Sequence, residues 1–378
     1  MDRRGLRWSD SLTDLKTSTP PSHFLIGVLE GEGIGPEVVG GALDVLSAVE
    51  SAGYGPFELR FGGAIGCEAE RVDGAPLTSD VISFCDEVFS GGGALFCGPG
   101  GGRFVYDLRR EFDLFCKISP VTAYPEISGA GRLKPGVIDG TDLVIVRENS
   151  SGIYQGSWSE SATDAEGRIA EHKFSYTERE VVRIIRVAAD IAGRRSGRLM
   201  VVVKDGGVPT VSALWRDCGA GVTRDMGIDC SFVNVDYAGY LLFDRPRELD
   251  VIVTPNLFGD ILIDLAGILS GSRGNTFSGN FAGDRTAVYQ TNHGAAYDLA
   301  GRDRANPVGQ ILSLAMMLRE SFGLVEAAAL IETAVLDVWR RGWRTDDLTE
   351  PRARIAGTTE MCSLVCEATL RRAGEAVA

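Results

Sequence analysis

The most constraining feature of the sequence is an alternation of short apolar runs with longer amphipathic stretches. The apolar runs are four to seven residues long, as buried strands often are: 24–29, 94–97, 142–147, 198–204, 231–236 and 250–254. The longer stretches repeat apolar residues at helical spacing: 37–51, 81–89, 106–112, 176–192, 211–218, 260–269, 307–322 and 324–341. Because such an alternation places helices over a largely parallel sheet, it predicts an α/β fold. The polar, glycine-rich segments 155–168 and 270–287 are predicted to be loops.

The composition is that of a globular protein and excludes two classes of partner. Of 378 residues, 44% are hydrophobic, enough to bury a large core over roughly two to three domain-sized units. The net charge of −14 disfavours nonspecific binding to nucleic acid, and no apolar run has the length of a membrane-spanning helix. The eight cysteines are scattered without a CxxC pair, so we expect reduced thiols and a cytoplasmic location. Residues 1–23 resemble neither a signal nor a transit peptide and are expected to form a flexible tail.

A glycine cluster follows the first apolar run. Gly31, Gly33 and Gly35 precede Pro36, which occupies the position where a Rossmann fingerprint requires its third glycine. Proline there fits the first turn of a helix, because its missing N–H would have no partner in any case. The cluster therefore predicts a tight strand-to-helix turn and argues against a Rossmann fold.

The segment DVIVTPNLFGDILID places two carboxylates on one helix face just beyond a strand. Asp260 and Asp264 are four residues apart, so their side chains point the same way. Close carboxylates repel each other unless a cation lies between them, and hard oxygen ligands suit Mg²⁺ or Mn²⁺. On spacing alone, an exposed acidic face would be the simpler interpretation. The apolar residues 261–263 between the acids favour a half-buried metal site instead.

A third cluster reads HGAAYDLAG from His293 onward. The small residues Gly294, Ala295 and Ala296 would let the backbone approach a flat ligand closely. Asp298 could accept hydrogen bonds from paired hydroxyl groups and would repel a phosphate placed there. A loop histidine is often purely structural, so this cluster alone leaves both interpretations open.

Five segments, taken in order, resemble the metal-dependent β-decarboxylating dehydrogenases, the family of isocitrate, isopropylmalate, homoisocitrate and tartrate dehydrogenases. The segments are VLEGEGIGPEV (28–38), LRREFDLF (108–115), VIVRENSSGIYQG (144–156), NLFGDILIDLA (256–266) and HGAAYDLAGRDRANP (293–307). Their order carries far more weight than any single motif. The resemblance runs from about residue 24 to the C-terminus.

This resemblance implies an isopropylmalate dehydrogenase-like two-domain fold with a large, mostly parallel sheet. Residues 24–114 plus 272–378 would form the larger, cofactor-binding domain. Residues 115–271 would form the smaller domain, which carries the interface of a homodimer. The active site would lie in the cleft between the two domains and draw residues from both subunits.

The resemblance also implies a mechanism and the residues that perform it. In this family, hydride passes from C2 of a 2-hydroxy acid to nicotinamide, the β-carboxylate is lost, and the enol is protonated while a divalent metal acts as Lewis acid. Asp260 and Asp264 match two metal ligands, and Asp236 matches a third that comes from the partner subunit. Lys204, also from the partner, matches the lysine that assists deprotonation of the C2 hydroxyl. Tyr154 matches the tyrosine that protonates the enol.

Substrate and cofactor contacts follow from the same resemblance. Arg109 and Arg147 match two of the three arginines that grip the substrate carboxylates, a task that suits the guanidinium fork. Asp298 matches the position where an acid marks preference for NAD, whereas NADP-using relatives place a lysine there. His293 and Asn306 match adenine contacts. The implied cofactors are therefore NAD and either Mg²⁺ or Mn²⁺.

The main departure from the family lies in the segment that would hold the substrate. The third arginine, which the family has in a Leu-Arg-Pro context, is Ser119 here, and the asparagine two residues earlier is Lys117. In an extended segment these two side chains share a face, so both are candidate substrate contacts. The segment between Gly102 and Arg109 is also about two residues shorter than in isocitrate dehydrogenases. Neither isocitrate nor isopropylmalate can therefore be assumed to be the substrate.

Three hypotheses of function stay open. The first is NAD- and metal-dependent oxidative decarboxylation of a 3-substituted malate with an unusual C3 group. The second is oxidation of a secondary alcohol without decarboxylation, which a lost carboxylate contact would permit. The third is a non-catalytic regulatory paralogue. Retention of Tyr154, Lys204 and all three aspartates argues against the third, because a regulatory subunit is free to lose them.

Overall fold

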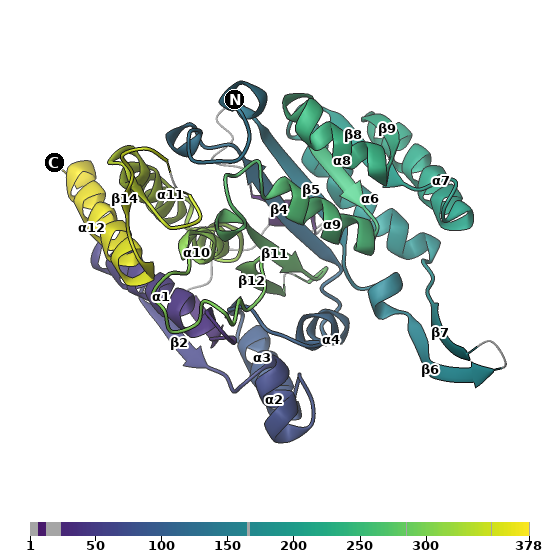
Figure 1. The fold of residues 1–378 in the computed structure, drawn as a ribbon, viewed down its shortest axis with the longest axis horizontal. Coiled ribbons are helices and arrows are strands. Elements are labelled where there is room, and N and C mark those ends of the chain that lie inside the picture. Colours follow the sequence, from purple (N-terminus) through teal and green to yellow (C-terminus); the bar gives the residue numbers. More distant parts are fainter. Residues whose placement is uncertain (1–6, 13–23, 165–166, 285, 349, 378) are drawn as a thin grey trace.

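A ten-stranded sheet runs through the part of the chain that the computed structural model describes, residues 7–12, 24–164, 167–284, 286–348 and 350–377 (Figure 1). Its strand order is β2-β1-β3-β12-β11-β4-β5-β10-β8-β9. The strands are β1 (Phe24–Leu29), β2 (Phe57–Phe61), β3 (Ala94–Cys97), β4 (Cys116–Thr122), β5 (Asp142–Glu148), β8 (Arg198–Val203), β9 (Asp229–Asn234), β10 (Val251–Thr254), β11 (Phe277–Phe281) and β12 (Ala287–Thr291). Six of the nine neighbouring pairs are parallel, and the three antiparallel pairs lie together around β11 and β4. The predicted α/β fold with a large, mostly parallel sheet is confirmed.

Helices pack along this sheet (Figure 1). They are α1 (Gly35–Ser51), α2 (Gly66–Asp73), α3 (Ser79–Ser90), α4 (Phe104–Glu111), α5 (Pro135–Ile138), α6 (Glu178–Gly193), α7 (Pro209–Met226), α8 (Val235–Asp244), α9 (Asn256–Ala266), α10 (Val308–Glu320), α11 (Val325–Arg340) and α12 (Thr358–Val377). Helix α10 is buried at every residue, between the sheet and α11. None of the described helices is long and apolar enough to span a membrane.

The two parts of the chain proposed as domains meet inside one continuous sheet. Segments 24–114 and 272–378 supply β1, β2, β3, β11 and β12, and segment 115–271 supplies β4, β5, β8, β9 and β10. The junction is the β11–β4 pair, where Asn280 lies opposite Lys117. On its other side β4 pairs with β5, which brings Lys117 opposite Arg147. Residues from both parts of the chain therefore lie side by side at the centre of the sheet.

Two segments predicted to be loops contain strands. Within 155–168 begins a hairpin of β6 (Ser157–Asp164) and β7 (Gly167–Lys173), which projects away from the body of the molecule (Figure 1). Strand β7 is almost entirely exposed, so it lacks the apolar alternation that marks a half-buried strand. Within 270–287 lies β11, whose buried positions include Ser278 and Asn280. Polar residues in a buried strand hide it from pattern-based prediction.

Residues 7–12, which lie within the expected tail, contact the core. Residues Trp8–Ser11 form a 3₁₀ helix that packs at the end of α10. The Ser9 amide donates to Glu320 Oε2 at 2.8 Å, and Arg7 Nη2 donates to the Glu320 carbonyl at 2.7 Å. These contacts attach the segment to the core. The rest of the predicted tail lies outside the described residues.

Candidate active site

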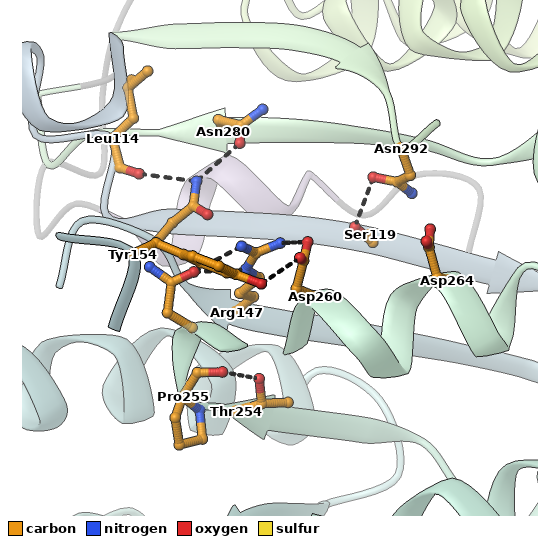
Figure 2. Close-up of polar contacts among 12 residues, drawn as sticks. Leu114, Ser119, Arg147, Tyr154, Thr254, Pro255, Asp260, Asp264, Asn280 and Asn292 are labelled. Carbon is orange, nitrogen blue, oxygen red and sulfur yellow. Dashed lines mark hydrogen bonds and ion pairs between the residues drawn. The ribbon is translucent and has the colours of Figure 1, made fainter. Parts of the chain in front are cut away.

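The centre of the site is the Asp260 carboxylate on α9. Strand β10 ends at Thr254, and α9 begins two residues later at Asn256, which places Asp260 one turn into the helix. Arg147, near the end of β5, donates from Nη1 to Asp260 Oδ1 at 2.6 Å. The hydroxyl of Tyr154 donates to Asp260 Oδ2 at 2.8 Å (Figure 2). Three residues predicted to belong to the site are thus brought together by contacts between distant parts of the chain.

The groups around Asp260 stabilise the ionised form of its carboxyl group. Burial raises the pKa of this carboxyl group, but Arg147, the Tyr154 hydroxyl and Lys117 together hold the pKa below its usual range. Burial and the hydrogen bond to Asp260 both raise the pKa of Tyr154. At neutral pH, Asp260 is therefore an anion and Tyr154 keeps its proton.

Asn256 is a site residue that sequence reasoning missed. Its Oδ1 accepts from Arg147 Nε at 3.0 Å and from Nη2 at 2.7 Å. Its own position is fixed, because its amide N–H donates to the Tyr176 hydroxyl and its Nδ2 donates to the Ser151 carbonyl. Arg147 is 1% exposed, so these contacts supply hydrogen bonds that the buried guanidinium needs. The available signal was the asparagine that opens the NLFGD motif.

A cavity of about 180 Å³ lies beside Asp260. It is lined by Pro99, Gly100, Val105, Tyr106, Arg109, Lys117, Asp260, Gln290, Thr291, Asn292, His293 and Gly294. These residues come from the loop after β3, from α4, β4 and α9, and from the end of β12. The cavity therefore joins two of the four predicted substrate contacts, Arg109 and Lys117, to the first residues of the predicted cofactor loop.

Two basic side chains on the cavity wall are buried near Asp260 but without a hydrogen bond or ion pair to any described residue. They are Arg109 and Lys117, which are 5% and 4% exposed. Burial, followed by the nearby Arg147, lowers the pKa of Arg109 to about 9. Burial, followed by Arg109 and Arg147, holds the pKa of Lys117 well below its usual value. An anion bound beside these groups would favour their protonated forms, so this wall is suited to an anionic ligand.

Ser119 shares a face of β4 with Lys117, as predicted, but does not border the cavity. It is fully buried, and its hydroxyl lies 3.5 Å from Asn292 Oδ1 (Figure 2). Asn292 is held in turn by a 3.0 Å bond from Nδ2 to the Phe277 carbonyl. Ser119 therefore contacts Asn292 and not the cavity, and it is Asn292 that lines the cavity wall.

The three carboxylates predicted to bind metal are not brought together within one chain. Asp260 and Asp264 lie on the same helix, and Asp264 Oδ2 accepts from Arg273 at 3.0 Å. Asp236, in the first turn of α8, pairs at 2.7 Å with Lys204 Nζ. Within the described ranges, no group of three His, Cys, Asp or Glu side chains could hold a metal ion. The donor types suit a hard divalent cation, but a single chain supplies only part of the set.

The predicted cofactor loop packs against the glycine turn after β1. The Ile34 amide donates to the Ala295 carbonyl at 2.9 Å, and a Cβ on Gly33, whose φ is +61°, would lie 2.0 Å from that oxygen. Glu32 fastens the same region, because Oε2 accepts from the Gly101 amide at 2.6 Å and from the Tyr297 hydroxyl at 3.1 Å. The strand-to-helix turn was predicted, but the role of Glu32 in joining three loops was not.

The remaining cofactor residues differ in their freedom to bind a ligand. Asp298 is exposed and has no partner among the described residues, so it is free to accept hydrogen bonds. Burial lowers the pKa of His293, whose Nδ1 lies 3.0 Å from the Gly294 carbonyl. The Asn306 side chain donates to Asn275 and Asp347 and accepts from the Val308 amide. Any contact from Asn306 to a cofactor would therefore use its backbone.

Known proteins resemble this chain along nearly its whole length. Residues 25–365 match the family model for isocitrate/isopropylmalate dehydrogenase. The 3-isopropylmalate dehydrogenase of Moorella thermoacetica is 38% identical over 358 residues, which cover 90% of this chain and 98% of that protein. The 3-isopropylmalate dehydrogenase of Carboxydothermus hydrogenoformans is 36% identical over 364 residues, covering 92% and 95%. The crystal structure of isocitrate dehydrogenase from Methylococcus capsulatus matches with a TM-score of 0.80 and 30% identity, covering 92% of this chain and 99% of that one.

Proposed function

Because the chain belongs to the isocitrate/isopropylmalate dehydrogenase family, we propose that it catalyses the NAD- and divalent-metal-dependent oxidative decarboxylation of a 3-substituted malate. The observation that carries this proposal is the convergence of Arg147 and Tyr154 on Asp260, beside a cavity walled by two more cations. Membership of a family of decarboxylating dehydrogenases favours this reaction over oxidation alone. The eight unpaired cysteines fit the cytoplasmic location that we propose for it.

In this proposal Arg109 binds one carboxylate of the malate core with paired hydrogen bonds. Arg147, whose Nε, Nη1 and Nη2 already donate to Asn256 and Asp260, binds the other carboxylate with its remaining N–H groups. Lys204 accepts the proton of the C2 hydroxyl, and Tyr154 delivers a proton to the enol carbon after CO₂ leaves. The raised pKa of Tyr154 keeps the phenol protonated at neutral pH, so its proton is present when the enol forms. Asp260, Asp264 and the partner's equivalent of Asp236 would hold Mg²⁺ or Mn²⁺. When bound, the metal supplies Lewis acidity and NAD accepts the hydride.

We also propose that the working enzyme is a homodimer with shared active sites. Asp236 pairs with Lys204 rather than joining Asp260, which is expected if both serve the site of a second subunit. Large apolar side chains lie exposed on α8 and α9, the helices that carry these acids: Tyr237 is 53% exposed, Tyr240 57% and Ile261 49%. A second copy packed on this face would bury them and complete the set of ligands.

The proposed substrate is neither isopropylmalate nor isocitrate. Support comes from β4, where the side chain that replaces the third arginine, Ser119, is buried against Asn292 and out of reach of the cavity. Lys117 supplies a compact positive charge instead of the third arginine. Its ammonium group lacks the planar, paired N–H donors with which a guanidinium binds a carboxylate. If the reaction of a substrate depends on a bidentate contact at position 119, this enzyme would stabilise its transition state poorly.

The test is production of NADH and CO₂ from a panel of 3-substituted malates, with Mg²⁺ or Mn²⁺ added. We expect equal amounts of the two products, loss of turnover when the metal is chelated, and recovery when it is restored. Asp260→Asn should raise steeply the metal concentration needed for half-maximal rate, whereas Asp73→Asn, an exposed acid at the end of α2, should not. Full activity in the presence of a chelator would contradict the metal assignment, and NADH without CO₂ would contradict decarboxylation.

A further inference from the structure

The position of the cation on β4 differs from the position of the arginine that the family pattern expects. Lys117 lies directly between Arg147 of β5 and Asn280 of β11 in the register of the sheet. Ser119 is two residues further along the strand, a step of about 6.6 Å. Lys117, unlike Ser119, lines the cavity together with Val105, Tyr106 and Arg109 of α4.

The cavity gives an uncharged branched substituent little to pack against. Of the side chains that line it, only those of Pro99 and Val105 are aliphatic. The remaining lining residues are glycines, polar or charged residues, and Tyr106. An isopropyl group gains binding energy from apolar contact in proportion to the area buried, so this wall offers it little. Placed beside Lys117, it would also leave a buried ammonium group without a partner.

Resting on the proposed function, we infer that the substrate of this enzyme is a malate whose C3 substituent ends in a tetrahedral oxyanion, such as a phosphonate, which Lys117 binds. Arg109 and Lys117 are the arginine and lysine side chains that line the cavity. With Arg109 and the remaining N–H groups of Arg147 assigned to the two carboxylates of the malate core, Lys117 is left for a third anion, whose charge would favour the protonated amine. An ammonium group is a compact charge with three donors, which suits a tetrahedral oxyanion better than a planar carboxylate.

The experiment compares kcat/KM for 3-(phosphonomethyl)malate, isocitrate and 3-isopropylmalate with the dimeric enzyme, NAD and Mn²⁺. We expect the phosphonomethyl compound to exceed each of the others by about tenfold or more. Lys117→Met, which keeps the length of the side chain and removes the charge, should lower the ratio of phosphonomethyl to isopropyl activity by about ten- to a hundredfold. Lys117→Arg should preserve more of the ratio, and the exposed Lys134→Met should leave it unchanged.

Lys117→Met removes a buried charge that has no partner among the described residues, so the variant is expected to fold; its melting temperature checks this. Calorimetric binding of 3-(phosphonomethyl)malate to the wild-type and Lys117→Met proteins gives a second readout that does not depend on turnover. Equal affinity in the two proteins, or a higher kcat/KM for isocitrate or isopropylmalate, would overturn the inference. If no malate yields NADH although the phosphonate binds through Lys117, the proposed reaction fails and the anion site stands.

Discussion

The hydroxyl of Tyr154 donates a 2.8 Å hydrogen bond to Asp260, and this contact links the proposed proton donor to the proposed metal site (Figure 2). Asp260 carries the negative charge that keeps the phenol protonated. A metal ion that binds Asp260 would weaken this hydrogen bond by competing for the carboxylate. The proton would then be less firmly held near the reacting carbon.

Tyr154→Phe removes that proton and leaves the aromatic ring in place. We expect kcat for product formation to fall by about 10²- to 10⁴-fold, the usual contribution of a positioned acid. Steady-state rates of NADH and CO₂ release measure the loss. Tyr54→Phe is the matched control, because Tyr54 does not line the cavity. A kcat within a factor of about two of the wild type would assign the proton to another group.

Shared active sites predict that two inactive variants can complement each other. In the proposed dimer each site takes Asp260 from one subunit and Lys204 from the other, so Lys204→Ala and Asp260→Asn damage the site from different subunits. When they are mixed and allowed to exchange subunits, about half of the dimers would be mixed, and each would hold one intact site. Activity should therefore rise from near zero to roughly a quarter of the wild-type value. A mixture no more active than its components, with subunit exchange shown independently, would place Lys204 in its own chain's site.

The exposed carboxylate of Asp298 predicts selection of NAD over NADP. It can accept hydrogen bonds from ribose hydroxyls and repels a 2′-phosphate, so Asp298→Lys should move the ratio of kcat/KM values toward NADP. A shift of about ten- to a hundredfold matches the removal of one repulsion and the formation of one charge-assisted hydrogen bond. Asp284→Asn, a change of charge at a turn between β11 and β12, should leave the ratio unaffected. Preference of the wild type for NADP would refute the assignment.

The contact between Ser119 and Asn292 predicts how the family arginine could be restored. Ser119→Arg alone places a long side chain against a fixed amide, so we expect a loss of stability of about 1–3 kcal/mol and little increase in activity. Ser119→Arg combined with Asn292→Ala opens that space and should raise kcat/KM for isopropylmalate by about tenfold. Thermal unfolding and steady-state kinetics of both variants measure the two effects. Higher activity from the single substitution would mean that Asn292 does not block the site.

The fold class could be predicted because its strongest signals are local. Apolar runs such as 142–147 are readable within one short segment and coincide with strands. The helix expected at 260–269 is found at Asn256–Ala266, and the strand expected at 231–236 is found at Asp229–Asn234. Strands β4 and β11 could not be recognised in this way. They are central in the sheet yet contain the buried polar residues Lys117, Ser119 and Asn280. Ser119 and Asn280 are hydrogen-bonded to asparagines far away in the sequence, and the Lys117 side chain makes no hydrogen bond among the described residues.

The candidate site could be predicted only in part for the same reason. The carboxylates of Asp260 and Asp264 share a helix, so their spacing is visible within one short segment. The hydrogen bond from Ser119 to Asn292 joins residues 173 positions apart in the sequence, and the hydrogen bonds from Arg147 to Asn256 join residues 109 positions apart. No local pattern encodes such pairs, because register and packing of the whole sheet bring them together.

The central claim is that the altered β4 segment has moved the substrate preference away from isopropylmalate. The most direct measurement is kcat/KM for 3-isopropylmalate, with NAD and Mn²⁺ at saturation, determined side by side with the 38%-identical enzyme from Moorella thermoacetica. The loss of one charged, bidentate contact predicts a value about ten- to a hundredfold below that of the relative. Equal values for the two enzymes would show that Ser119 and Lys117 are neutral replacements and would contradict the claim.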